Sequence, residues 1–396
     1  MKSASALKRI CLALCEKLLT TKERSPEEIE ADQIERIIII RRHDSLEDLL
    51  LATPVFRAVR QHYPNAYISV LTRTHMAPFI QNNVNLDEVI CVDHGIRKWS
   101  LPRMVHLIKK LRRRYDLAIV LFTVSHSFSS DLLAYFTRAQ FILGSEHLVF
   151  PGCKKNFFYN LLAPYSELNK HETVRNLDIT RFIGIETEWL HEEIHLTRED
   201  KEKAIDYLNR AGLKPDDFIL AINLDAWPKN DQDVALLVHL AKYFSSKYNA
   251  RLVVSWELEN EAAALEFVSS LPFRPIESNG LSLQQHLTLL YFCDLVFCYD
   301  NIIMHLAACV GTPLIAIFNE SDPYHRKPIG SQFMAFKTEE GIGAAITSTQ
   351  IIDMATRLCS QYPKRNRLKG ENFDISDQVL DDYLNTLSTF EDSKTE

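Results

Sequence analysis

Two polar segments of this 396-residue chain each lie between a predicted buried strand and a predicted helix. The first follows the β-branched run at 37–40 and carries the carboxylates of Asp44, Glu47 and Asp48. A carboxylate at the carboxyl end of a strand can face a cleft and act as a general base. An acidic side chain in the first turn of a helix can also simply cap that helix. The residues alone leave both roles open.

The second polar segment follows the apolar run at 295–298. Asp300 and Asn301 end that run, and His305 falls in the first turns of the next predicted helix. Taken alone, a histidine in apolar surroundings is more often a hydrogen-bonded core residue than a ligand. An Asp-x-x-x-x-His pattern at the mouth of a second α/β domain favours a site more than a single histidine does.

The elements that must position these segments alternate between strand and helix. In the first half, strands are predicted at 37–40, 68–71, 89–92, 117–121 and 141–143, with helices at 48–62, 104–114 and 131–136. In the second half, strands are predicted at 218–222, 252–255, 295–298 and 314–318, with helices at 234–248, 260–269, 283–292 and 304–310. Such alternation predicts two doubly wound parallel sheets, which bind ligands at the carboxyl ends of their strands.

The domain organisation expected from these patterns has four parts. A helix and linker occupy 1–35, two Rossmann-like α/β domains occupy 36–195 and 196–360, and a polar, acidic tail occupies 361–396. Residues 7–19 form an amphipathic pattern, whose apolar core is too short for a signal peptide. That helix either docks on the fold or adsorbs to an anionic membrane surface.

Composition narrows the function classes. A net charge of -7 argues against a protein built mainly to neutralise nucleic-acid phosphates, so we expect no nucleic-acid partner. No run approaches the ~18 apolar residues that a membrane span needs. The chain has 11 glycines, whereas average usage would give about 28. Neither G-x-x-x-x-G-K-[ST] nor G-x-G-x-x-G is present, which disfavours ATP hydrolysis and dinucleotide oxidoreduction.

The two polar segments together resemble the heptosyltransferase family, glycosyltransferase family 9. The matching residues are Asp48, Thr53 and Pro54 in the first segment, and Asp300, 304–308 (Met-His-Leu-Ala-Ala) and 311–313 (Gly-Thr-Pro) in the second. The resemblance spans roughly residues 36–330. It implies a GT-B fold, with the acceptor on the N-terminal domain and a nucleotide-sugar donor, similar to ADP-heptose, on the C-terminal one. It also implies inversion at the anomeric carbon without a metal or other cofactor.

The resemblance also assigns roles to single residues. Asp48 would take the proton from the acceptor hydroxyl. Asp300, Asn301 and His305 would line the nucleotide and diphosphate, Leu281 would pack against the base, Glu257 would bind the ribose, and Lys229 would pair with the diphosphate. As an alternative, Lys229 is a solvated loop lysine. Three arginines near strand ends of the first domain are placed to meet acidic groups of a core-glycan acceptor: Arg41, Arg42 and Arg73.

The sequence departs from the family pattern in the phosphate-binding loops. Glu47, Ile302 and Asn319 stand where the family has glycine, and Asp225 and Ala226 stand about where it has hydroxyl residues. Each change costs on the order of 1–3 kcal/mol of anion binding unless it is compensated. Either the donor sits differently in this chain or the site has decayed. A catalytically degenerate relative that binds glycan or protein is therefore the alternative function.

Two further charged patterns can be explained either by a structural role or by a functional one. Asp231 and Asp233 spell the Asp-x-Asp of metal-dependent transferases, but they open a predicted helix, and capping explains them better. The basic run from Lys98 to Arg114 is either a solvated helix face or a surface for anionic lipid. With a lipopolysaccharide-type acceptor, the expected location is cytoplasmic and peripheral on the inner membrane.

Overall fold

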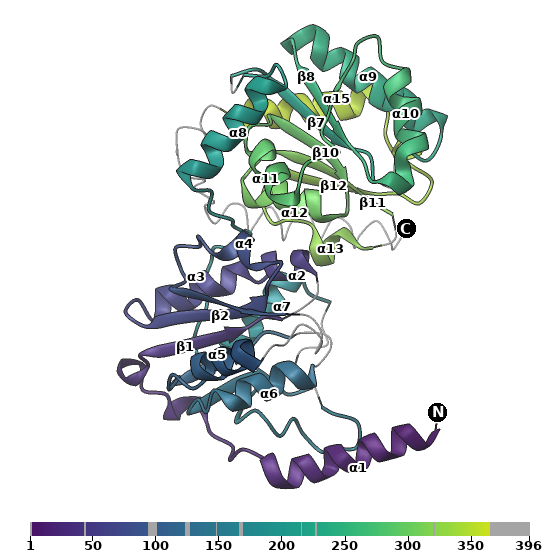
Figure 1. Cartoon of the computed structure of the whole chain (residues 1–396). Coiled ribbons are helices and arrows are strands. Elements are labelled where there is room, and N and C mark those ends of the chain that lie inside the picture. Colours follow the sequence, from purple (N-terminus) through teal and green to yellow (C-terminus); the bar gives the residue numbers. More distant parts are fainter. Residues whose placement is uncertain are drawn as a thin grey trace. The chain divides into compact units, whose positions relative to one another are not determined.

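A computed structural model describes residues 2–42, 45–93, 101–122, 127–147, 149–165, 169–214, 216–225, 228–319 and 321–364. Asp44, Ala226, Lys98 and most of the predicted tail lie outside these residues. The chain divides into two compact units, Met1–Leu190 and His191–Glu396 (Figure 1). Among the described residues, no helix combines the length and apolar character that crossing a bilayer requires.

The first unit, Met1–Leu190, is called unit 1. It is built on a six-stranded parallel sheet in the order β3-β2-β1-β4-β5-β6. Its strands are β1 (Arg36–Ile40), β2 (Tyr67–Arg73), β3 (Glu88–Val92), β4 (Leu117–Val120), β5 (Phe141–Ser145) and β6 (Leu161–Ala163). Its helices are α1 (Lys2–Leu19), α2 (Leu46–Leu50), α3 (Thr53–His62), α4 (Ala77–Ile80), α5 (Leu101–Leu111), α6 (Phe128–Phe136) and α7 (Glu172–Arg181), with 3-10 turns η1 (Pro26–Glu28) and η2 (Ala31–Gln33).

The two faces of this sheet are covered by different helices. On one face, α1, α5 and α6 share one hydrophobic cluster with Ile38 and Ile40 of β1. On the other, α3 and α7 pack against each other. Because β1 pairs with β2 on one side and β4 on the other, its four isoleucines are fully buried, as their β-branched pattern predicts.

The helix predicted at 48–62 is in fact two helices. α2 ends at Leu50, and α3 begins at Thr53, with Pro54 in its first turn. Proline lacks the N–H that a continuous helix would require and is tolerated in a first turn, so it starts a new helix here. The break places the carboxylate of Asp48 on a short helix of its own beside the carboxyl end of β1.

The second unit, His191–Glu396, is called unit 2 and has the same architecture. Its sheet is also parallel throughout, in the order β12-β11-β10-β7-β8-β9. Its strands are β7 (Ile219–Asn223), β8 (Arg251–Ser255), β9 (Ile276–Glu277), β10 (Leu295–Tyr299), β11 (Leu314–Phe318) and β12 (Phe333–Lys337). Its helices are α8 (Arg198–Arg210), α9 (Asp231–Tyr248), α10 (Glu261–Ser269), α11 (Leu283–Tyr291), α12 (Ile302–Cys309), α13 (Pro323–Arg326), α14 (Ile342–Ala345) and α15 (Ser348–Gln361), with the 3-10 turn η4 (Leu258–Asn260).

The start of α9 gives the Asp-x-Asp pattern a structural role. Asn230 caps the helix by accepting a hydrogen bond from the Asp233 amide. The buried Asp233 carboxylate accepts hydrogen bonds from the amides of Lys229 and Gly343, at 3.0 and 2.8 Å. Asp233 therefore ties the α9 and α14 starts together, as the capping interpretation predicts for this position.

Candidate functional site

The candidate site of unit 2 lies at the carboxyl ends of β7, β8 and β10. β10 and β7 are hydrogen-bonded neighbours, although they are far apart in sequence. The strand order therefore reverses between them, and a crevice that can bind a ligand forms at such a switch point. The polar residues Asn223, Ser255 and Asp300 stand at or just after the ends of these three strands.

A chain of hydrogen bonds connects the strand ends. Asn301 donates from Nδ2 to Asn223 Oδ1 at 2.8 Å. Asn223 donates in turn to Asp225 Oδ2 at 2.9 Å and to Ser255 Oγ at 3.0 Å. Asp225 Oδ1 accepts the Glu257 backbone N–H at 2.5 Å. Because each side chain is fixed by its neighbour, this edge of the sheet is a preformed polar surface.

The N-terminus of α12 is partly occupied by its own cap. Asn301 Oδ1 accepts the Ile303 N–H at 3.0 Å, which satisfies one of the amide groups that an anion would otherwise contact. Asp300, half-buried beside it, accepts a hydrogen bond from the Ser321 hydroxyl. Asp300 and Asn301 thus lie together at the predicted position, with their polar atoms already bonded to protein groups.

His305 has a different environment from the one expected of a donor-lining residue. Its side chain is fully buried, and its Nδ1 lies 3.0 and 2.8 Å from the two carboxylate oxygens of Glu192. Glu192, itself 3% exposed, belongs to the extended segment that precedes α8. The expectation that His305 faces the diphosphate does not fit this burial. The ring is instead a partnered core residue that fixes α12 to the start of unit 2.

The other predicted donor residues surround the same strand ends. Exposed Lys229 lies between β7 and α9 and donates from Nζ to the Glu339 carbonyl at 3.3 Å. Glu257 is exposed directly after β8, and the half-buried Leu281 precedes α11. Asp225 adds a further carboxylate. The edge is therefore acidic, with Lys229 as the cation that the sequence analysis assigned to it.

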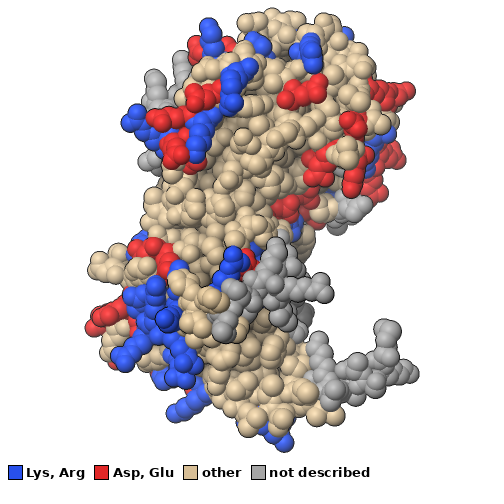
Figure 2. All heavy atoms as spheres, in the orientation of Figure 1, with Lys and Arg blue, Asp and Glu red and all other residues tan. Residues whose placement is uncertain are grey.

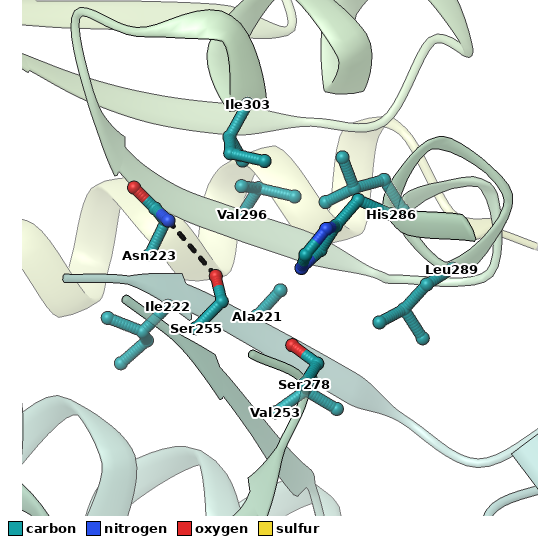
Figure 3. A pocket seen from close by; sticks show the side chains of 11 residues that line it. Ala221, Ile222, Asn223, Val253, Ser255, Ser278, His286, Leu289, Val296 and Ile303 are labelled. Carbon is teal, nitrogen blue, oxygen red and sulfur yellow. Dashed lines mark hydrogen bonds between the residues drawn. The ribbon is translucent and has the colours of Figure 1, made fainter. Parts of the chain in front are cut away.

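A small hollow lies beneath this edge, between the sheet and the helices α11 and α12 (Figure 3). Its polar lining is Asn223, Ser255, Ser278 and His286, and its space admits about one water molecule. Both ring nitrogens of His286 are buried, and neither has a hydrogen-bond partner in the part of the chain that the structure describes. Burial lowers the pKa of His286, and the nearby Asp225 raises it by a smaller amount.

In unit 1, the candidate base Asp48 is held through its backbone. Arg41 donates from Nε and Nη2 to the Asp48 carbonyl, at 3.1 and 2.9 Å, and from Nη1 to the Leu121 carbonyl. Its guanidinium is also 3.9 Å from the carboxylate of Glu172. The Asp48 side chain is half-buried. Arg41 thus joins α2 to the ends of β1 and β4.

The three arginines assigned to the acceptor differ in exposure. Arg41 is 1% exposed, so its guanidinium has no surface for an acceptor, and it positions Asp48 instead. Arg73 ends β2 and is 5% exposed. Arg42 is half-buried and donates to Ser129 Oγ at 2.6 Å. Arg42 and Arg73 both lie at the carboxyl edge of the unit 1 sheet, but Arg73 is buried like Arg41, so only Arg42 of the three has a partly exposed side chain.

Several residues of these sites went unnoticed in the sequence. Asn223 and Ser255 carry a readable signal, because each is a polar last residue that directly follows a run of apolar residues in its strand. His286 carries none, since its buried position follows from the packing of α11 over the sheet. Glu192 also carries none, because its partner His305 is distant in the sequence. Arg41 was predicted, but as an acceptor-binding residue, and its bond to Leu121, 80 residues away, could not be read from the sequence.

The sequence of this chain is similar to that of a known protein family. Residues 104–353 match the sequence model of glycosyltransferase family 9 (heptosyltransferase). The putative lipopolysaccharide heptosyltransferase 4 of Escherichia coli (strain K12) is 21% identical over 298 residues, which cover 73% of this chain and 76% of that protein.

Solved structures agree with the fold. The glycosyl transferase family 9 protein of Veillonella parvula DSM 2008 matches with a TM-score of 0.66 at 19% identity, over 83% of this chain and 98% of that one. The E. coli heptosyltransferase WaaC with ADP matches with a TM-score of 0.59 at 16% identity, over 82% and 99%. The expected GT-B fold of two parallel-sheet domains is thereby confirmed.

Proposed function

The chain belongs to glycosyltransferase family 9 and is a glycosyltransferase, and we propose that it transfers a heptose-like sugar from a nucleoside-diphosphate donor to a lipopolysaccharide core or related glycan. The observation that carries the proposal is the pair of strand-edge sites. One holds Asp48, whose backbone is fixed by Arg41, and the other a polar surface built from Asn223, Asp300 and Asn301. The WaaC structure with ADP supports an adenine nucleotide as the product-side ligand.

The proposed reaction is a single displacement at the anomeric carbon. The acceptor oxygen forms its bond to that carbon as the bond to the diphosphate oxygen breaks, which inverts the configuration. Asp48 accepts the hydroxyl proton, and the electron pair of the broken bond leaves with the nucleoside diphosphate. Arg41 holds the Asp48 carbonyl, so the base has one position relative to the sheet. No metal takes part in this scheme.

Stabilising the leaving group is the demanding part of this scheme. Negative charge grows on the diphosphate, and it needs fixed hydrogen-bond donors or a cation. We assign that task to Lys229 and the first amides of α12, with Glu257 accepting hydrogen bonds from the ribose and Leu281 packing on the base. The Asp225 carboxylate opposes the charge, so we expect weaker nucleotide binding than a site without it would give.

Nucleotide binding by the full chain is the first test. ADP, UDP and GDP are added separately, with and without EDTA, and the melting temperature is followed. A ligand at 100 times its dissociation constant adds ~2.7 kcal/mol to the free energy of unfolding. We expect ADP to raise the melting temperature equally with and without EDTA. The absence of a shift with every nucleotide would point to the degenerate alternative, in which the fold binds glycan or protein without catalysis.

Turnover with ADP-heptose and a core-glycan acceptor is the second test. Asp48→Asn should lower kcat by about 10²–10⁴-fold, because the general base is lost, and it should leave the ADP shift unchanged. Glu47→Gln is the matched control on the same helical turn and should retain most of the activity. If both variants lose activity equally, or if Asp48→Asn also abolishes the ADP shift, the role of Asp48 as base is wrong. NMR of the product reports the anomeric configuration.

We also propose that this work is done at the cytoplasmic face of the inner membrane. A lipopolysaccharide-type acceptor is anchored by its lipid, so the enzyme must reach a glycan close to the bilayer surface.

A further inference from the structure

Helix α1 exposes an apolar stripe. The side chains of Ile10, Leu14 and Leu18 are 66%, 56% and 73% exposed. They are spaced four residues apart and therefore follow one side of the helix. Arg9 and Lys17 are exposed beside them. An apolar row of this kind with adjacent cations is unusual for a face that meets only water.

The opposite side of α1 is firmly packed on unit 1. Leu12 is buried in the cluster that contains Phe150 and Phe157, and Cys15 and Leu19 pack against that cluster. The carboxylate of Glu16 accepts the Lys154 backbone N–H at 2.8 Å. The helix is thus fixed in orientation, and its outward stripe is a constant feature of the unit 1 surface.

Helix α5 repeats this arrangement. Leu107 and Leu111 point into the same hydrophobic cluster as Leu12 of α1. On its outer side, Met104, Val105 and Ile108 are 38%, 44% and 44% exposed. Both helices contribute buried leucines to one cluster on the same face of the sheet, and each leaves an apolar row exposed to solvent.

Exposed cations adjoin the apolar residues of α5. Lys110 and Arg113 contact Glu88 at 2.9 and 2.8 Å. Lys109 and Arg112 are exposed, and within the described residues they form no ion pair. Lys109 lies one turn after Val105, and Arg112 one turn after Ile108, so charge and apolar surface are contiguous. Figure 2 shows basic side chains gathered over this part of unit 1.

The two units differ in the sign of their charge. Residues 1–190 contain 26 Lys and Arg against 21 Asp and Glu, whereas residues 191–396 contain 19 against 31. The net charges are thus +5 and -12. An anionic surface therefore attracts unit 1 and repels unit 2.

We propose that the α1–α5 face, defined as Ile10, Leu14, Leu18, Met104, Val105, Ile108, Lys109 and Arg112, binds the surface of an anionic phospholipid bilayer. The apolar rows enter the boundary between headgroups and acyl chains, and the cations contact lipid phosphates. A second copy of the chain is the less suitable occupant, since it would bring two positive faces together. The proposal does not depend on sugar transfer and is tested without it.

The test is co-sedimentation of the full chain with vesicles of phosphatidylcholine alone or mixed with phosphatidylglycerol, at low and high salt. We expect binding to the mixed vesicles that weakens at high salt. The double variant Lys109→Gln/Arg112→Gln should bind about 25-fold more weakly, because each cation near an anionic surface contributes about five-fold. The variant Leu14→Ser/Leu18→Ser should lose about ten-fold or more, because apolar burial is removed.

Matched controls come from unit 2. Leu258 and Leu265 are 83% and 45% exposed there, so Leu258→Ser/Leu265→Ser removes similar apolar surface from the acidic unit. Lys242→Gln removes one exposed cation of α9. Both control variants should bind vesicles as the wild type does, and every variant should keep the wild-type melting temperature.

Three results would overturn the proposal. One is equal binding of the wild type and the α1–α5 variants to mixed vesicles, and another is equal binding of the wild type to both vesicle types. The third is a lipid-free dimer that Leu14→Ser/Leu18→Ser converts to monomer, because a second copy would then occupy the face. The ADP-dependent melting shift is measured on the same samples, so failure here is distinguishable from failure of the proposed activity.

Discussion

Replacing Arg41 by lysine tests how the candidate base is positioned. The hydrogen bonds of the buried guanidinium include two to the Asp48 carbonyl and one to the Leu121 carbonyl. A lysine retains the charge but lacks the planar fork, so it reaches one of the two carbonyls. Each lost bond to a charged donor costs about 1.5–3 kcal/mol, and the other carbonyl is left without its buried partner. We expect a loss of about 2–4 kcal/mol in the free energy of unfolding.

The expected change in melting temperature follows from the size of the unit. About 1 kcal/mol shifts the melting temperature of a 150–250-residue domain by about 2–4 °C, so unit 1 should melt about 4–16 °C lower. Turnover should fall more than stability implies, because a displacement of about 1 Å at a catalytic group can cost 10²-fold. Activity is therefore measured well below the melting transition of Arg41→Lys.

The pattern of effects distinguishes positioning from a general loss of structure. Arg41→Lys should lower kcat while the ADP-dependent melting shift of unit 2 stays intact. Arg42→Lys is the control for stability, since the bond from Arg42 to Ser129 is exposed and its loss should cost at most about 1 kcal/mol. An Arg41→Lys enzyme with wild-type kcat would refute the claim that this guanidinium sets the place of Asp48.

Two further substitutions address buried titratable groups. His286→Leu removes two buried nitrogens without partners and should raise the free energy of unfolding by about 1–2 kcal/mol in denaturant melts at pH 7. Because burial lowers the pKa of His286 below 6.5, the free energy of unfolding of the wild type should decrease as the pH falls through 6.5, and that of His286→Leu should decrease less. A His286→Leu protein less stable than the wild type at pH 7 would contradict this reasoning. Burial raises the pKa of Asp131 from 3.8 to about 6. The buried protonated carboxyl therefore contributes fully to the free energy of unfolding below pH 3.8, and this contribution, up to about 3 kcal/mol, is lost as the pH rises through 6. Asp131→Asn should flatten that slope, and parallel stability curves for variant and wild type would show that another group causes it.

Much of the fold was predictable because strands and helices of this architecture have local signatures. The apolar runs that became β1, β10 and β11 bury both faces, and so they lack polar alternation. The short strands β6 and β9 were not predicted, since two or three residues carry no period. The break between α2 and α3 was missed although its proline is visible, because the apolar spacing continues across it.

The positions of the candidate site residues were also predictable from the local sequence. Asp48, Asp300 and Asn301 follow buried strands, and that order alone places them at sheet edges. Their hydrogen-bond partners were not predictable. The departure at Asp225 was visible in the sequence, but only the structure shows that its side chain joins Asn301 through Asn223 in one hydrogen-bond network.

The amino-acid sequence by itself determined two parallel sheets, the helices between their strands and the polar residues at the strand ends, because these depend on patterns that repeat within a few residues. Only the tertiary structure decided that Arg41 holds the Asp48 helix, that His305 is bonded to Glu192, and that α1 and α5 pack into one hydrophobic cluster. The pairs Arg41–Leu121 and His305–Glu192 are separated by 80 and 113 residues. Contacts over such distances depend on how whole elements pack, and no local pattern encodes that packing.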